Sequence, residues 1–320
     1  MEDWRVDYER KTDELAAAFV AGHPEYEIDR EQPEKRGLAN CIVFARRGAE
    51  RVVFKRFAEE DRKRRESFAL RYWTSTGLVP QLIDEDKDFV VMSFLPGILL
   101  EEIIESVDVG SVGQQIGPAL EGLTSVSLQE DVARDFASRP YSGLSAEEYL
   151  QRFLEAARSI CEISEYFRGS LFHKSIDFID SQTAFILDQP PLLYNQDIRN
   201  MMFEGNDFRG FFDLELTWIG TEIIQIGSLW WLLRAAERKA NRGRALWAAI
   251  VESYGEARDR GLSEQEAAAS RAVANILVWR DISVYGSWSG DKEKAPEDVD
   301  EASSRYAEEI EMISETMCGV

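Results

Sequence analysis

The stretch Leu192–Gly220 decides the fold: LLYNQDIRNMMFEGNDFRGFFDLELTWIG. Its first residues, 192–194, are apolar and predict a buried strand. A polar turn follows, and it contains Asp197 and Asn200. Both residue types are common in turns, so this segment indicates chemistry only if further polar groups meet it.

Such groups follow directly. Residues 201–203 and 208–212 predict a β-hairpin around a Gly-Asn-Asp turn, and Asp213 and Glu215 come after it. Carboxylate and amide oxygens at the ends of neighbouring strands are the groups that a magnesium–nucleotide site needs. One carboxylate can orient a hydroxyl while the other and the amide hold the metal against phosphates.

The composition limits the class of protein. The chain has 320 residues, of which 44% are hydrophobic, enough for one large domain or two lobes with separate cores. It contains no apolar run of about 18 residues, so no membrane partner is expected. The charged N-terminus lacks an apolar signal core, which predicts a cytoplasmic protein. Three scattered cysteines and two histidines predict neither a disulfide framework nor a zinc site.

The net charge is −22 and the isoelectric point is about 4.6. A phosphate backbone would be repelled, so nucleic acid is not an expected partner. A cationic small molecule would be attracted to such a chain. Salt adaptation or simple solubility would give the same charge, so the charge alone does not choose a substrate.

The N-terminal third predicts a small antiparallel sheet with one helix. Residues 41–45 and 51–57 alternate as two strands around an Arg-Arg-Gly turn, and Lys55 lies in the second. A helix is predicted over 59–75, and on it Glu66 could pair with Lys55. The alternatives are a lysine that points to solvent and a solvated helix face.

Two more strands are predicted at 81–84 and 89–94, before Pro96-Gly97 ends the sheet. Beyond that point the chain becomes mainly helical. The sequence therefore predicts an α+β, bilobal architecture. Residues 1–96 form a nucleotide-binding lobe, and 97–320 form a larger lobe with the catalytic loop, metal site and substrate groove.

The order of these features resembles the aminoglycoside phosphotransferase-like (choline kinase-like) branch of the protein-kinase-like fold, from about residue 36 to about 234. That family covers its nucleotide with a loop of the form GG-x-S-N, similar to 36–40 here. Its strand lysine and helix glutamate match Lys55 and Glu66. Its hinge, which often ends in Leu-Pro-Gly, is similar to 92–97.

The family's metal-binding I-D-W-E is similar to 212–215, and its catalytic loop H-G-D-x-x-x-x-N is similar to NQDIRN here. Three departures stand out. Asn195 replaces the histidine, Asn200 follows Asp197 by three positions instead of five, and Gln225 replaces the second acid of the family's G-D-P-x-x-D-L-A.

The resemblance implies a role for each matched residue. Lys55 would hold the α- and β-phosphates, with Glu66 positioning it. Asp213 and Asn200 would bind Mg²⁺. Asp197 would orient the acceptor hydroxyl and accept its proton as the γ-phosphoryl group is transferred.

Other roles stay open between two interpretations. Glu215 either binds metal or caps the next segment, and Arg199 either neutralises the transferred phosphate or pairs with a nearby acid. The Trp230-Trp231 pair and Trp218 either belong to the core or a groove wall, or form a face for a cationic substrate. The remaining expected nucleotide contacts come from the covering loop and the hinge: Gly37, Asn40, Met92 and Phe94.

The implied activity is ATP- or GTP-dependent phosphorylation of a hydroxyl on an aminoglycoside-, sugar- or amino-alcohol-like small molecule, by a monomer or homodimer. The main alternative is a pseudokinase that binds nucleotide or a partner without transfer, which the altered catalytic loop would favour. A third possibility is transfer of a nucleotidyl group on the same fold.

Overall fold

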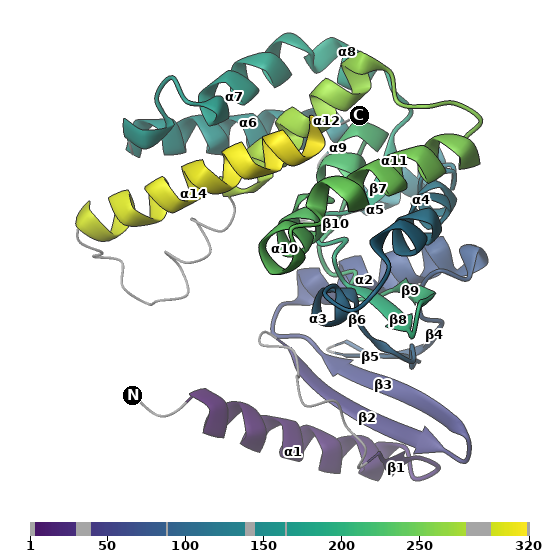
Figure 1. The fold of residues 1–320 in the computed structure, drawn as a ribbon. Helices are drawn as coiled ribbons and strands as arrows, with labels where there is room; N and C mark the ends of the chain where they lie inside the picture. Colours follow the sequence, from purple (N-terminus) through teal and green to yellow (C-terminus); the bar gives the residue numbers. More distant parts are fainter. Residues whose placement is uncertain are drawn as a thin grey trace. The chain divides into compact units, whose positions relative to one another are not determined.

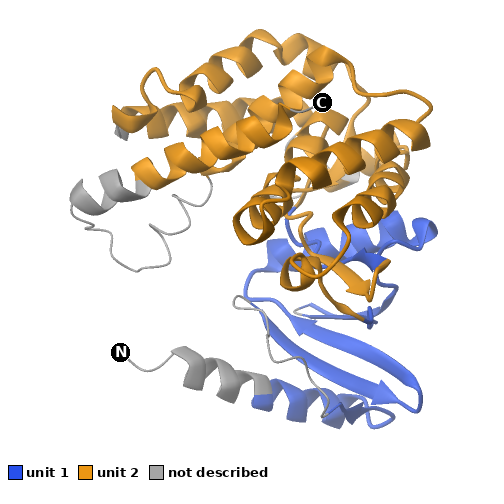
Figure 2. Ribbon diagram, in the orientation of Figure 1, with its two compact units in different colours: residues 1–96, 209–216 blue, residues 97–208, 217–320 orange. Residues whose placement is uncertain are grey.

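A computed structural model describes residues 4–29, 40–87, 89–137, 145–163, 165–279 and 296–318 (Figure 1). The chain divides into two compact units (Figure 2). The first comprises residues 1–96 and 209–216, and the second comprises 97–208 and 217–320. No helix in the described ranges combines the length and the apolar character that crossing a bilayer requires.

In its described residues, the first unit contains a five-stranded antiparallel sheet and two α-helices, and the strand order is β1-β2-β3-β5-β4. The predicted 41–45 and 51–57 hairpin is present, and the helix after it covers most of the predicted range. The elements are α1 (Trp4–Gly22), β1 (Glu27–Ile28), β2 (Cys41–Arg47), β3 (Glu50–Arg56), α2 (Glu60–Trp73), β4 (Leu82–Glu85) and β5 (Phe89–Ser93).

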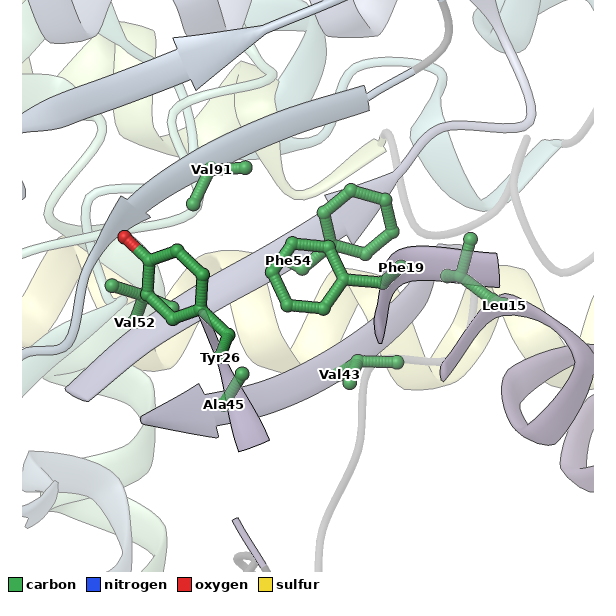
Figure 3. Close-up of a cluster of buried hydrophobic side chains, with 8 residues drawn as sticks. All are labelled: Leu15, Phe19, Tyr26, Val43, Ala45, Val52, Phe54 and Val91. Carbon is green, nitrogen blue, oxygen red and sulfur yellow. The ribbon is translucent and has the colours of Figure 1, made fainter. Parts of the chain in front are cut away.

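One face of this sheet packs against α1. Strand alternation sends every second side chain to this face, among them Val43 on β2 and Phe54 on β3 (Figure 3). Leu15 and Phe19 of α1 lie against them, and the Phe19 and Phe54 ring centroids are 4.5 Å apart. The same alternation turns Lys55 to the opposite face, where α2 lies.

The second unit is mainly helical, with short strands. Its helices are α3 (Leu100–Ile103), α4 (Val109–Thr124), α5 (Glu130–Ala137), α6 (Ala146–Ile163), α7 (Leu171–Ser181), α8 (Thr183–Leu187), α9 (Glu222–Gly227), α10 (Trp230–Ala240), α11 (Gly243–Ala257), α12 (Glu264–Leu277) and α14 (Pro296–Met317). Its strands are β6 (Ile98–Leu99), β7 (Leu192–Asn195), β8 (Met201–Glu204) and β10 (Thr217–Gly220). The chain crosses between the units within β9 (Asp207–Phe211), which follows β8 in the predicted hairpin.

Two of these elements place the polar turn. Strand β7 is fully buried and pairs antiparallel with β10, so that Asn195 lies opposite Thr217. The turn with Asp197 and Asn200 follows β7 directly. A short buried apolar strand therefore fixes where the polar residues begin, as its sequence predicts.

Glycines bring α4 and α11 close together. A β-carbon on Gly117 would lie 2.1 Å from Ser253 Oγ and 2.4 Å from the Tyr254 backbone nitrogen. A β-carbon on Gly113 would lie 2.5 Å from the Ala249 β-carbon. The two glycines, about one helical turn apart, leave no side chains between α4 and α11 at these positions, so the backbones of the two helices can approach closely.

Candidate active site

The first group of predicted site residues is built around Lys55, which is 4% exposed. Strand β3 is paired on both sides at this residue, with Ile42 and Val90 as the Cα partners. Glu66 on α2 is 1% exposed, and its Oε2 lies 2.5 Å from Lys55 Nζ. Burial of an ammonium group is tolerable only with a charged partner, and the expected Lys55–Glu66 ion pair is present.

Two further carboxylates reach the same ammonium group. Asp213 Oδ1 lies 2.5 Å from Lys55 Nζ, and Glu215 Oε2 lies 3.2 Å from it. A hydrogen bond of 2.8 Å from the Phe211 N–H to the Leu78 carbonyl ties this segment to the first unit. Asp213 has a left-handed backbone, with φ of 57°, a conformation that aspartate adopts more readily than most residues.

The charged groups in this cluster shift one another's pKa values. Burial alone would lower the pKa of Lys55, but Asp213, Glu66 and Glu215 outweigh it and raise that pKa. Burial raises the pKa of Glu66, and Asp213 and Glu215 add to this increase against the opposing effect of Lys55. Burial would also raise the pKa of Glu215, but Lys55 and Arg62 lower it overall.

The three carboxylates suit a hard divalent cation. One oxygen each from Glu66, Asp213 and Glu215 lie within 4.8 Å of one another. Carboxylate oxygens are the donors that Mg²⁺ prefers, so this donor set fits that metal. The other predicted ligand, Asn200, belongs to the second unit.

Asn40 and Arg62 hold Glu215. The Asn40 side-chain amide donates to Glu215 Oε2 at 2.5 Å, and Arg62 Nη1 donates to Glu215 Oε1 at 2.8 Å. The Ala58 N–H donates to Asn40 Oδ1 at 3.4 Å, which ties the start of β2 to the end of β3. Gly37, the other residue expected in this loop, lies outside the described residues.

Arg62 was missed by reasoning from the sequence. It precedes Glu66 by four residues on α2, and residues at this spacing share one helix face. That spacing was a usable signal once Glu66 had been placed beside Lys55.

The predicted hinge leaves few free backbone groups. Met92 is 4% exposed and pairs with Val53 in the sheet. The Phe94 N–H donates to the Arg51 carbonyl at 3.1 Å, so this donor is already used within the sheet. The next N–H along the chain is that of Leu95, before Pro96.

The second group of predicted site residues lies in the turn after β7. The Asn200 N–H donates to the Asp197 carbonyl at 3.4 Å, and the Met201 N–H donates to the Arg199 carbonyl at 2.8 Å. These bonds close a tight turn, consistent with the short spacing between Asp197 and Asn200. Asp197 is 8% exposed.

Arg199 lies between a carboxylate and an aromatic ring. Its Nε is 2.8 Å from Asp197 Oδ1, and its guanidinium carbon is 4.3 Å from the Trp231 ring centroid. The Arg234 guanidinium carbon is 4.8 Å from the same centroid, and Trp230 stacks on Trp231 with centroids 4.3 Å apart. Trp231 thus contacts guanidinium groups of its own chain, and Arg199 pairs with a nearby acid.

The predicted residues therefore form two groups. Lys55, Glu66, Asp213, Glu215 and Asn40 meet in the first unit. Asp197, Arg199 and Asn200 share one turn of the second unit. The roles assigned to them remain predictions.

Comparison with known proteins finds no matching family model and no matching curated protein. Solved structures do match over nearly the whole chain. A macrolide 2'-phosphotransferase from Brachybacterium faecium is 14% identical and has a TM-score of 0.62, over 93% of this chain and 98% of that one. The ADP-bound aminoglycoside phosphotransferase APH(2'')-Ib is 15% identical and has a TM-score of 0.59, over 93% and 99%.

An ethanolamine kinase from Plasmodium vivax is 12% identical and has a TM-score of 0.57, over 91% of this chain and 81% of that one. The small antiparallel sheet and the mainly helical remainder agree with these structures. The predicted architecture is confirmed: the chain has the α+β, protein-kinase-like fold of the aminoglycoside phosphotransferases and of the choline and ethanolamine kinases.

Proposed function

We propose that this protein transfers the γ-phosphoryl group of ATP or GTP to a hydroxyl group of a small molecule. The observation that carries the proposal is the cluster of Lys55 with Glu66 and Asp213. A buried ammonium group held by a helix carboxylate, with a second carboxylate beside it, is the arrangement that binds a magnesium nucleotide in this fold.

Each residue has a defined task in the transfer. Lys55 neutralises nucleotide phosphate oxygens, and Glu66 holds its ammonium group in place. Asp197 accepts the proton of the acceptor hydroxyl as the oxygen–phosphorus bond forms and the bond to the β-phosphate oxygen breaks. Arg199, beside Asp197, offers positive charge to the transferred group. Mg²⁺, when bound by Asp213 with Asn200 and Glu215, supplies further charge neutralisation.

Features of the hinge refine where the base of the nucleotide binds. Because the Phe94 N–H is used by the Arg51 carbonyl, we assign the adenine or guanine edge to the Phe94 carbonyl and the Leu95 N–H. Similar structures with ADP and AMP-PNP support the choice of a nucleotide as phosphoryl donor.

The acceptor is proposed to be a small molecule because the similar structures include complexes with gentamicin, streptomycin and hygromycin B. A cytoplasmic location agrees with three cysteines that are all free thiols. No role is proposed in binding nucleic acid.

A pseudokinase is the second candidate. The observation that favours it is the short turn, in which Asn200 follows Asp197 by three positions. In that case, nucleotide would bind in the first unit without phosphoryl transfer.

The deciding experiment combines binding with turnover. The protein is melted with and without ATP and MgCl₂, and it is then incubated with a panel of aminoglycosides, macrolides and amino alcohols while product mass is followed. We expect an acceptor to gain one phosphoryl group with the wild type and the control Asp177→Asn, and not with Asp197→Asn or Asp213→Asn. Asp177 is an exposed helix residue and a matched control. Stabilisation by nucleotide without any product would favour the pseudokinase. If the protein showed no stabilisation and formed no product, both candidates would be overturned.

A further inference from the structure

Two buried amide side chains form a relay beneath Asp197. Gln225, on α9, accepts a hydrogen bond from the Asn195 backbone N–H through Oε1, at 3.2 Å. Asn195 accepts one from the Asp197 backbone N–H through Oδ1, at 3.1 Å. Both side chains belong to residues that are 0% exposed. These two hydrogen bonds therefore connect α9, through the end of β7, to Asp197, the residue proposed as the base.

The chemistry of the donors fixes the orientation of both amides. A backbone N–H can bond only to an acceptor, so the atom that faces it must be the amide oxygen. The opposite ends of the two amides, Asn195 Nδ2 and Gln225 Nε2, have no hydrogen-bond partner among the described residues. Burying unpaired donors costs free energy, so packing alone does not account for these two residue types.

A carboxylate would avoid the unpaired donors, because it accepts without donating. It would also place a negative charge in a fully buried position, which desolvation opposes. At position 195, that charge would lie two residues from Asp197, where like-charge repulsion adds to the cost. A neutral amide provides the acceptor without that charge.

We propose that Asn195 and Gln225 are positioning residues, a relay of two neutral amides that fixes the Asp197 backbone and adds no buried negative charge to this turn. The catalytic consequence rests on the proposed function, whereas the relay itself is a property of the unliganded protein. Asn195 and Gln225 are two of the departures from the family motifs. On this view they form one matched device and are not marks of a lost site.

Amide hydrogen exchange tests the relay without any substrate. The peptide that covers 192–200 is compared in the wild type, Gln225→Met, Gln225→Glu and the control Thr221→Val. Thr221 lies one turn before Gln225, and its buried hydroxyl has no hydrogen-bond partner among the described residues. None of these substitutions changes the sequence of the peptide itself.

We expect the exchange of this peptide to accelerate about tenfold or more in Gln225→Met and to stay close to wild type in Thr221→Val. Gln225→Glu keeps an acceptor but buries a negative charge, so it should recover only part of the protection that the wild-type glutamine gives. Full protection in Gln225→Glu would show that a neutral side chain is not required. Equal protection in Gln225→Met and the wild type would overturn the relay. If Gln225→Met does not fold, Asn195→Leu and Asn195→Asp give the same contrast at the other amide, read from exchange of the Asp197 amide.

Kinetics then test the positioning role. In Gln225→Met we expect kcat to fall about 10- to 100-fold with the nucleotide KM unchanged, because the loop that orients the acceptor is displaced. A parallel loss of nucleotide affinity, or no change in kcat, would contradict a positioning role. If the wild type transfers no phosphoryl group to any acceptor, the proposed function fails while the exchange result still decides the relay.

Discussion

At the scale of single residues, the cluster around Lys55 has more negative than positive charge. One ammonium group faces three carboxylates, and Arg62 forms a second ion pair with Glu215. The burial of Lys55 and Glu66 makes each dependent on the other. Removing one partner of such a pair leaves an uncompensated buried charge.

Lys55→Met should therefore destabilise the protein by about 3–5 kcal/mol at neutral pH, because Glu66 loses its charged partner. The change in the free energy of unfolding is measured by urea denaturation. Lys55→Met combined with Glu66→Met should lose much less than the sum of the two single variants. Additive losses would show that the pair does not interact in the folded protein.

The two glutamates of this cluster should respond to pH in opposite directions. The pKa of Glu215 is lowered by Lys55 and Arg62, against the opposing effect of burial. Its contribution to stability is present above the unfolded-state pKa and is lost as pH falls through the folded value. The pKa of Glu66 is raised by burial, so its contribution is lost as pH increases.

Glu215→Gln should be less stable than the wild type at about pH 7. The difference in the free energy of unfolding should become smaller as the pH is lowered to about 4. For Glu66→Gln, the free energy of unfolding should approach that of the wild type, or exceed it, as the pH is raised from about 4 to about 7. Urea denaturation at several pH values gives both slopes. Slopes of the same sign for the two variants would contradict these charge assignments.

At the scale of elements, local patterns explain what the sequence could predict. The β2–β3 hairpin follows from alternation and its turn, and the Lys55–Glu66 pair follows from a strand followed by a helix. The convergence of Asp213 and Glu215 on Lys55 depends on contacts between residues far apart in the chain, 158 positions for Asp213, which no local pattern contains. The use of Asn40 to hold Glu215 has the same origin.

The α4–α11 contact provides the prediction at this scale. Gly117→Ala would push a β-carbon into Ser253 and the backbone of α11, so we expect a loss of about 1–3 kcal/mol or more from overpacking. Gly110→Ala, on the same helix, places its β-carbon no closer than 3.5 Å to any neighbour and should change stability little. Thermal and urea denaturation compare the two. Equal effects would show that the close approach of α4 and α11 does not require Gly117.

At the scale of the whole molecule, the net charge of −22 should lower the stability of the folded state relative to the unfolded chain. The 59 acidic residues outnumber the 37 basic ones, and self-repulsion favours the expanded chain. Salt screens this repulsion, since the Debye length falls from about 30 Å at 0.01 M to about 10 Å at 0.1 M. Ion pairs on the surface are screened as well, but each contributes little.

Raising NaCl over this range should therefore stabilise the protein by about 1 kcal/mol, seen as a melting temperature about 2–4 °C higher. The matched control replaces three exposed glutamates of α14 together, Glu308→Gln, Glu311→Gln and Glu315→Gln, which removes three of the 22 excess negative charges. Its melting temperature should rise less steeply with salt than that of the wild type. Salt screens buried pairs such as Lys55–Glu66 only weakly, so they do not contribute to this salt dependence. A melting temperature that falls with salt would therefore mean that attraction between surface ion pairs outweighs the net repulsion.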